Sequence, residues 1–256
     1  MTPTLPGDFL RLPIAHRALH DVRAGRPENS RAAVRAAVAR RYAIEIDVQP
    51  SADGVAMVFH DDRLDRLTQE TGPIRARSAE ALGRIALTGA SEGIPTLAEV
   101  LALVAGKVPL LVEVKDQDGE LGPKVGALEA AVARDLAGYG GPVAVMSFNP
   151  HSVAAMAEAA PALPRGLTTM NWEIEEARAI PEDRRAELAA IADFDRVGAC
   201  FISHHWRDLA AAPVVALKAR GVPVLCWTIR SPAEETQARE RADNITFEGY
   251  LARPPA

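Results

Sequence analysis

The chain of 256 residues has little cysteine, no long apolar run and no surplus of positive charge. Its two cysteines, Cys200 and Cys226, lie in apolar, strand-like runs, which predicts buried free thiols without chemistry. The most apolar stretch, residues 97–114, is interrupted by charged residues and a proline, and a membrane span needs about 20 consecutive apolar residues. The net charge of −5 argues against a protein that neutralises a nucleic-acid backbone. Any phosphate that the chain binds is therefore expected to be small and held locally.

The length and the amino-terminal residues set two further expectations. Residues 1–13 contain proline, glycine and charged side chains, so they do not resemble a signal peptide, and a cytoplasmic location is expected. The length suits one large α/β domain over residues 1–256, because barrels of this class commonly run as single units of about 250 residues.

The most informative stretch of the sequence is residues 43–61. Glu45 and Asp47 stand two positions apart among Ile and Val, which predicts a strand with both carboxylates on one face. Because like charges on one face repel and are costly to bury unpaired, a divalent ion or a Lys or Arg partner is expected between them. Asp53 and Gly54 then turn the chain, and a second apolar run ends at His60.

Polar residues also stand at the ends of two other predicted strands. His16 and Arg17 follow a short strand at residues 10–15, and Glu113 and Lys115 leave one face of a strand at 108–114. A single histidine is more often structural than catalytic, and a Glu beside a Lys is most often an ion pair. The adjacent arginine, however, favours an anion site, and the Glu and Lys pair joins a larger set of chemically active groups.

The rest of the chain alternates short apolar strands with helices. Further strands are predicted at residues 143–147, 163–168, 199–203, 222–228 and 244–247, and helices at 30–41, 78–84, 96–104, 123–137, 150–159, 182–191, 209–220 and 232–241. About eight parallel strands result, which predicts a (β/α)₈ TIM barrel, with residues 61–95 as a small insertion after the second strand. In such barrels the chemistry collects at the carboxyl ends of the strands, where the polar residues above are expected to converge.

A series of short motifs lies along the chain. They are Ala15-His16-Arg17, Pro27-Glu28-Asn29-Ser30, Glu45-Ile46-Asp47-Val48, Asp53-Gly54, His60-Asp61, Leu64 with Arg66 and Thr68, Pro95-Thr96-Leu97, Glu113-Val114-Lys115, Ser147-Phe148 and Trp227-Thr228. In this order, over residues 12–247, the chain resembles the glycerophosphodiester phosphodiesterases. Each motif is weak alone, and their order makes the resemblance specific.

The resemblance implies metal-dependent hydrolysis of a small glycerophosphodiester to glycerol phosphate and an alcohol. It implies metal ligands Glu45, Asp47 and Glu113, proton-transfer residues His16 and His60, phosphate-binding residues Arg17 and Lys115, and pocket-lining residues Phe148 and Trp227. Three carboxylates suit a hard ion, Mg²⁺ or Ca²⁺, better than zinc, and the sequence does not choose between the two. No nucleic acid or membrane insertion is expected, and the oligomeric state stays open.

The chain departs from the family pattern at two places. Ala18 stands where the family usually has glycine after His-Arg, and Thr246-Phe247-Glu248 stands where the last strand usually ends in Thr-Asp. Ala18 adds a methyl group close to the expected phosphate site, and Phe247 is expected to reshape the pocket floor. Substrate choice is therefore less constrained by the resemblance than reaction type.

Two other functions fit parts of the sequence. The first is a lyase or phospholipase of the same barrel type, which would act on a lipid phosphodiester and release a cyclic phosphate. Such an enzyme would be expected to have an exposed apolar rim for membrane docking, and the predicted loops show no clear cluster of Trp, Phe and Leu, which argues against this alternative. The second is a barrel that binds a phosphorylated metabolite without turnover, which would not need paired histidines. His204 and His205, at a predicted strand end, are left without a role.

Overall fold

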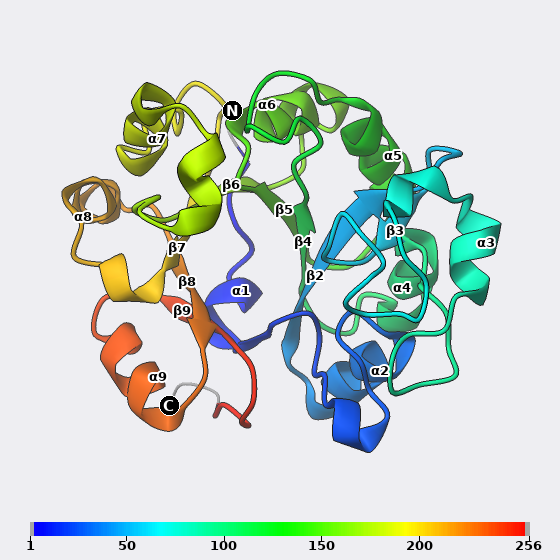
Figure 1. Ribbon diagram of the computed structural model, residues 1–256. Coiled ribbons are helices and arrows are strands. Elements are labelled where there is room, and N and C mark those ends of the chain that lie inside the picture. Colours follow the sequence, from blue (N-terminus) through cyan, green and yellow to red (C-terminus); the bar gives the residue numbers. More distant parts are fainter. Residues whose placement is uncertain (1–2, 254–256) are drawn as a thin grey trace. The chain divides into compact units, whose positions relative to one another are not determined.

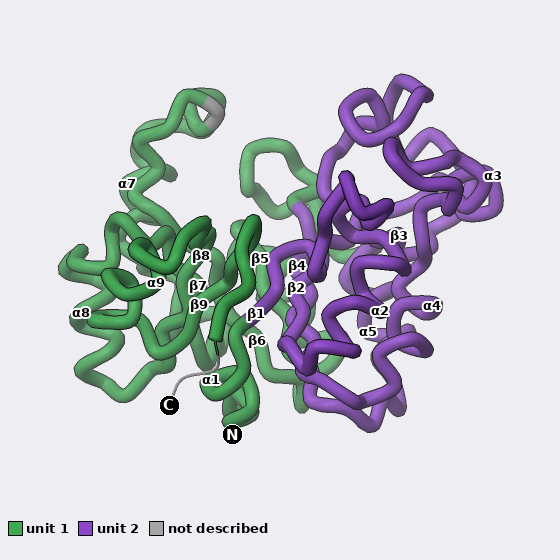
Figure 2. Tube along the Cα trace, turned by 90° about the horizontal axis from the view of Figure 1, so that it is seen from below, with its two compact units in different colours: residues 1–13, 116–126, 144–256 green, residues 14–115, 127–143 purple. Residues whose placement is uncertain are grey.

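The computed structural model describes residues 3–253, so residues 1–2 and 254–256 of the predicted domain lie outside the description (Figure 1). By their internal contacts these residues divide into two compact units (Figure 2). Unit 2 comprises residues 14–115 and 127–143, and unit 1 comprises the remainder. The expectation of a single domain stays a prediction. None of the helices within residues 3–253 is long and apolar enough to cross a membrane.

Unit 2 contains three parallel strands and one antiparallel strand. They are β1 (Ile14–Ala15), β2 (Ala43–Pro50) and β4 (Leu110–Val114), with β3 (Ala56–Val58) antiparallel to β2. Its helices are η1 (Val22–Ala24), α2 (Arg31–Arg40), η2 (Ile74–Ala76), α3 (Ala79–Arg84), α4 (Leu97–Val104) and α5 (Ala127–Leu136). Strand β2 pairs with both β1 and β4, and in the second pairing Asp47 lies opposite Glu113.

Unit 1 contains five consecutive parallel strands. They are β5 (Val143–Ser147, all but its first residue in this unit), β6 (Arg165–Thr169), β7 (Phe201–His205), β8 (Val224–Ile229) and β9 (Asn244–Phe247), and each pairs with the next. Its helices are α1 (Asp8–Arg11), α6 (Pro150–Ala159), η3 (Glu175–Ala179), α7 (Glu182–Ala189), η4 (Trp206–Asp208), α8 (Ala212–Ala219) and α9 (Pro232–Arg239). Within residues 3–253, eight parallel strands thus alternate with helices, which confirms the predicted (β/α)₈ TIM-barrel class.

Helix starts follow the local signals read from the sequence. The Ser30 hydroxyl accepts a hydrogen bond from the backbone N–H of Ala33 at 3.1 Å and begins α2. The spacing of Thr96 and Glu99 in the sequence predicts a capping box, and the two residues form it at the start of α4. Both signals act over three residues, which is why the sequence alone locates them.

The insertion at residues 61–95 has a small apolar core of its own. Leu64, Ile74, Leu82 and Leu87 are fully buried there, together with side chains delivered by β3. Short antiparallel bridges, such as that between Thr68 and Leu87, link its turns. These contacts give a polar, loop-rich segment a defined conformation beside β3.

Several predicted element boundaries differ from those in the structure. Residues 10–15 form a strand only at Ile14–Ala15, because Asp8–Arg11 is the short helix α1, which buries Phe9. The helix predicted from residue 123 begins at Ala127, because the carboxylates of Asp116 and Asp118 accept backbone N–H groups and hold residues 116–126 as a loop. Strand β7 extends to His205 instead of ending at residue 203.

The cysteines carry no disulfide. Cys226 is buried, as predicted, and Cys200 is half-buried. Burial raises the pKa of both thiols, which disfavours the reactive thiolate.

Candidate active site

A cluster of three buried carboxylates forms where β2 and β4 pair. Glu45 and Asp47 lie on β2 and Glu113 lies on β4, with oxygen atoms within 4.8 Å of one another. These residues are 1%, 1% and 6% exposed, respectively. The predicted common face of Glu45 and Asp47 therefore exists, and the β2 and β4 register adds the third carboxylate to it.

Lys115 lies between two of these carboxylates. Its Nζ atom is 2.8 Å from Asp47 Oδ1 and 2.6 Å from Glu113 Oε1. Asp47 Oδ2 also accepts a hydrogen bond from Asn29 Nδ2 at 2.9 Å and lies 3.7 Å from Arg17 Nε. A cationic partner for the carboxylates was expected, and the chain itself supplies one.

The pKa values of Asp47 and Glu45 move in opposite directions. Burial alone would raise the pKa of Asp47, but Lys115, His60 and Arg17 together hold it far below its ordinary value. Burial raises the pKa of Glu45 well above its ordinary value, and the charges of Asp47 and Glu113 add to the effect. The cations of the chain thus compensate the charge of Glu45 less than that of Asp47.

This donor set fits a hard divalent cation. Three carboxylates converge on two cationic side chains, and the raised pKa of Glu45 means that further positive charge would stabilise its ionised form. Mg²⁺ and Ca²⁺ both prefer oxygen ligands of this kind. A cation bound to these oxygens would share Asp47 and Glu113 with the ammonium group of Lys115.

The loop after β1 is tied to Glu45. The backbone N–H of Arg17 donates to Glu45 Oε2 at 2.7 Å, and the N–H of Ala18 donates to the Glu45 carbonyl oxygen at 2.9 Å. Arg17 and Ala18 have φ angles of 50° and 63°, in the left-handed region. At Ala18, which carries a Cβ atom, this conformation costs about 1 to 2 kcal/mol. The two hydrogen bonds to Glu45 hold the loop in it.

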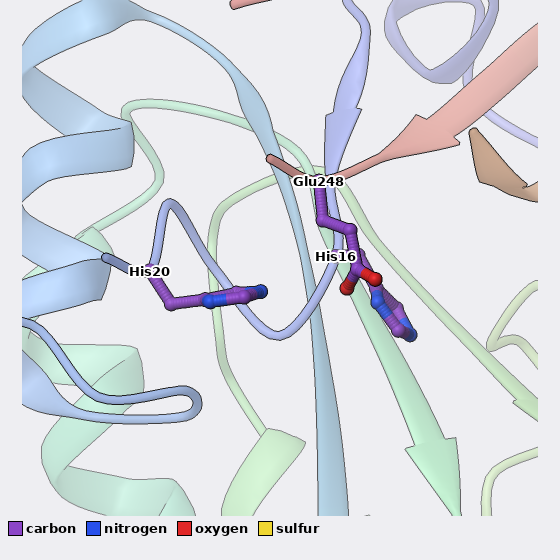
Figure 3. Close-up of side chains that lie close together, drawn as sticks. All are labelled: His16, His20 and Glu248. Atoms are coloured by element: carbon purple, nitrogen blue, oxygen red, sulfur yellow. The ribbon is translucent and has the colours of Figure 1, made fainter. Parts of the chain in front are cut away.

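His16 begins this loop, and a second histidine lies close to it. Ring nitrogens of His16 and His20 are within 4.8 Å of each other, and both side chains are half-buried (Figure 3). Glu248, which is also drawn there, follows β9 and belongs to unit 1. No role was assigned to His20 from the sequence, and its proximity to His16 was missed.

His60 follows β3 and is held by Asp61. The His60 Nδ1 atom lies 2.7 Å from Asp61 Oδ1, and Gln49 Nε2 donates to the His60 carbonyl oxygen at 3.2 Å. Burial alone would raise the pKa of Asp61, but its hydrogen bonds with His60 and Arg66 keep it well below its ordinary value. Asp61 is therefore ionised and can only accept, so Nδ1 carries the proton and Nε2 of the neutral ring has the lone pair.

Three charged residues near these groups had been given no role. Glu28 Oε1 accepts from Arg17 Nη1 at 2.7 Å, and Arg66 contacts both Glu28 and Asp61. Each of the three stands in a motif that carried the family resemblance. Their place in these motifs could have indicated that Glu28, Asp61 and Arg66 belong to the site, but the motifs do not indicate which residues they contact.

Phe148 and Trp227 belong to unit 1, whereas the other seven predicted site residues belong to unit 2. Their rings meet edge to face with centroids 5.4 Å apart, and Trp227 Nε1 donates to the Ser203 carbonyl oxygen at 2.9 Å. Trp172 and His205 extend this aromatic cluster at centroid distances of 5.7 and 5.2 Å. The two predicted pocket-lining residues thus lie together, and neither Trp172 nor His205 was assigned to them from the sequence.

A TIM barrel with acidic residues on two paired strands and histidines that follow two strands suits a phosphoric diester hydrolase, and sequence comparison agrees. A profile of the Glycerophosphoryl diester phosphodiesterase family matches residues 16–244. The chain belongs to this family. It is 33% identical over 244 residues to a Bacillus subtilis (strain 168) protein named "Putative glycerophosphodiester phosphodiesterase YhdW", covering 91% of this chain and 90% of that one. The family and the enzyme class predicted from the sequence are confirmed.

Solved structures confirm the fold. An Oleispira antarctica phosphodiesterase in complex with its product sn-glycerol-3-phosphate aligns with a TM-score of 0.74 and 24% identity, over 93% of each chain. A glycerophosphodiester phosphodiesterase from Thermotoga maritima aligns with a TM-score of 0.68 and 18% identity, over 92% of this chain and 94% of that one. At these identities the likeness establishes the TIM-barrel architecture.

Proposed function

We propose that this enzyme hydrolyses glycerophosphodiesters to glycerol phosphate and an alcohol, with a divalent cation held by Glu45, Asp47 and Glu113. Family membership supports the reaction class, and the Oleispira phosphodiesterase, with its bound sn-glycerol-3-phosphate, supports a small substrate of this kind. The observation that carries the metal proposal is the buried carboxylate cluster, in which the pKa of Glu45 is raised.

The cationic side chains around the carboxylate cluster can offset the charge that makes a phosphodiester hard to hydrolyse. A phosphodiester resists hydrolysis because its negative charge repels nucleophiles and because an alkoxide is a poor leaving group. Arg17 and Lys115 bind the phosphoryl oxygens, and a cation held by Glu45, Asp47 and Glu113 would supply further positive charge to offset the negative charge that develops on them. Lys115 is held by two carboxylates, so it exchanges part of that pairing for the phosphate.

His16 and His60 transfer the protons in two steps. One imidazole takes the proton from the free glycerol hydroxyl next to the phosphate ester, and that oxygen attacks phosphorus while the other imidazole protonates the departing alcohol. The resulting cyclic phosphate is opened by water with the two roles exchanged. The lone pair on His60 Nε2 suits the role of base, because Asp61 keeps the proton of the neutral ring on Nδ1. After Nε2 has taken a proton, the same nitrogen can act as the acid.

The half-buried aromatic pair completes the proposal. Phe148 and Trp227 present apolar ring surface, which suits the carbon skeleton of glycerol better than the charged phosphate. We assign them to the glycerol side of the substrate.

Release of glycerol phosphate, followed by ³¹P NMR, tests the function. Purified enzyme with Mg²⁺ or Ca²⁺ is expected to convert a glycerophosphodiester, and the chelated and dialysed enzyme is expected to lose turnover until the cation is restored. No release with either cation would refute the reaction, and full turnover in metal-free buffer would remove the metal from it.

A substrate analogue tests the two-step route separately. An analogue without the neighbouring hydroxyl cannot form the cyclic phosphate and is expected to be hydrolysed at least about 10²-fold more slowly, because intramolecular attack has a high effective concentration. Similar rates for substrate and analogue would favour direct attack by water.

A further inference from the structure

Arg66, from the insertion, joins two carboxylates with four hydrogen bonds. Its Nε and Nη2 atoms donate to Asp61 Oδ2 and Oδ1, both at 2.7 Å. Its Nη1 and Nη2 atoms donate to Glu28 Oε2 and Oε1, both at 2.9 Å. Paired hydrogen bonds of this kind fix the carboxylates in direction as well as in position.

Each of these carboxylates in turn holds a residue that the proposed function uses. Asp61 Oδ1 lies 2.7 Å from His60 Nδ1, and Glu28 Oε1 lies 2.7 Å from Arg17 Nη1. A continuous chain of charged hydrogen bonds therefore runs from His60 through Arg66 to Arg17, within unit 2. Arg66 is the middle member of this chain of five residues. In the contacts described for them, Arg66 meets only the two carboxylates, and it touches neither the His60 imidazole nor the Arg17 guanidinium.

The geometry requires a guanidinium group at this position. A Lys ammonium is a single point of charge, so it cannot offer the fork that meets two carboxylates side by side. Burial alone would raise the pKa of Glu28, but hydrogen bonds and charge from Arg66 and Arg17 lower it and keep it ionised. Removing Arg66 would leave Glu28 with one cationic partner and free it to rotate.

We propose that Arg66 is a positioning residue: it fixes Asp61 and Glu28, and through them the tautomer of His60 and the direction of the Arg17 guanidinium. This inference rests on the proposed roles of His60 and Arg17. It gives the insertion a part in catalysis. Asp61 and Arg66 do not meet the substrate, but they hold the residues that do.

A purely structural role for Arg66 predicts a different result. The Arg66 side chain is 48% exposed, and exposed ion pairs contribute about 0 to 1 kcal/mol to stability. If stability were its only contribution, its removal would leave turnover unchanged at temperatures where the enzyme is folded.

The test compares Arg66→Ala and Arg66→Lys with Arg63→Ala. Arg63 lies three positions away in the same insertion, is 54% exposed and pairs with Asp65. Both Arg66 variants are expected to lose about 10²-fold in kcat, since small misplacements of reacting groups have effects of that order. KM should rise less, and Arg63→Ala should match the wild type. Added guanidinium ion should restore part of the kcat of Arg66→Ala without changing that of Arg63→Ala.

A spectroscopic readout separates this inference from the proposed function. In ¹⁵N-histidine-labelled enzyme, the His60 ring, assigned with His60→Ala, should show a protonated Nδ1 in the wild type and a mixture of tautomers in Arg66→Ala. Unchanged His60 signals together with wild-type kcat in both Arg66 variants would overturn the inference. A wild type that releases no glycerol phosphate would refute the proposed function, and the His60 spectra would still decide whether Arg66 fixes the tautomer.

Discussion

Replacing Lys115 by methionine is expected to destabilise the metal-free enzyme strongly. Lys115 is 14% exposed and neutralises Asp47 and Glu113 at 2.8 and 2.6 Å, so the substitution leaves two buried carboxylates without their closest cation. Removing one partner of a buried ion pair typically costs about 3 to 5 kcal/mol. Arg17 remains 3.7 Å from Asp47, so we expect the lower end, about 3 kcal/mol.

A divalent cation should reverse much of this loss. For a domain of this size, about 3 kcal/mol corresponds to a fall in Tm of roughly 6 to 12 °C. A cation at 100 times its dissociation constant stabilises the folded state by about 2.7 kcal/mol. The gain should be larger in Lys115→Met than in the wild type, because in the variant the cation does not share its ligands with an ammonium group.

Denaturation with chelator and with added Mg²⁺ or Ca²⁺ measures both effects. Lys218→Met is the matched control, because Lys218 pairs with Asp243 at 2.7 Å but is 42% exposed, which predicts a loss of at most about 1 kcal/mol. Equal losses for the two variants in chelator would refute the argument from burial. If the cation stabilises Lys115→Met and the wild type by the same amount, the claim that the cation shares Asp47 and Glu113 with Lys115 is refuted.

Three further predictions concern the same site. His16→Ala and His60→Ala should each lower kcat by about 10²-fold or more, with unchanged circular dichroism. The double variant should be scarcely worse than the worse single variant, since the effects of groups that act as a unit are not additive. Fully additive losses would assign one of the two histidines a structural role. Asp47→Asn should lose bound metal and turnover together, which metal analysis and assay of one preparation check. Glu45→Gln should stabilise the metal-free enzyme at neutral pH, because the raised pKa of Glu45 means that its charged form opposes folding. That gain should vanish as the pH falls below the ordinary range of a glutamate, where the carboxyl is protonated in both states, and a gain that persists there would contradict the pKa argument.

Patterns of two to four residues were enough to predict most of the secondary structure. Alternation of acidic and apolar residues located β2, and the caps at Ser30 and Thr96 located two helices. The same local patterns were misleading at residues 10–15, because Asp8–Arg11 forms a four-residue helix that buries Phe9, and apolar periodicity within residues 10–15 does not reveal it. The cytoplasmic location and the roles of the site residues stay predictions.

The sequence by itself determined which chemical groups stand at strand ends, because side-chain direction along a strand and the motifs around it are local properties. Only the tertiary structure decided which groups meet. The pairing of β2 with β4 brings Glu113 to Asp47, and a fold over 38 positions brings Arg66 to Glu28. The physical reason is that the energy of a charge depends on its distance to every neighbouring charge and on the water excluded around it, and long-range packing sets both.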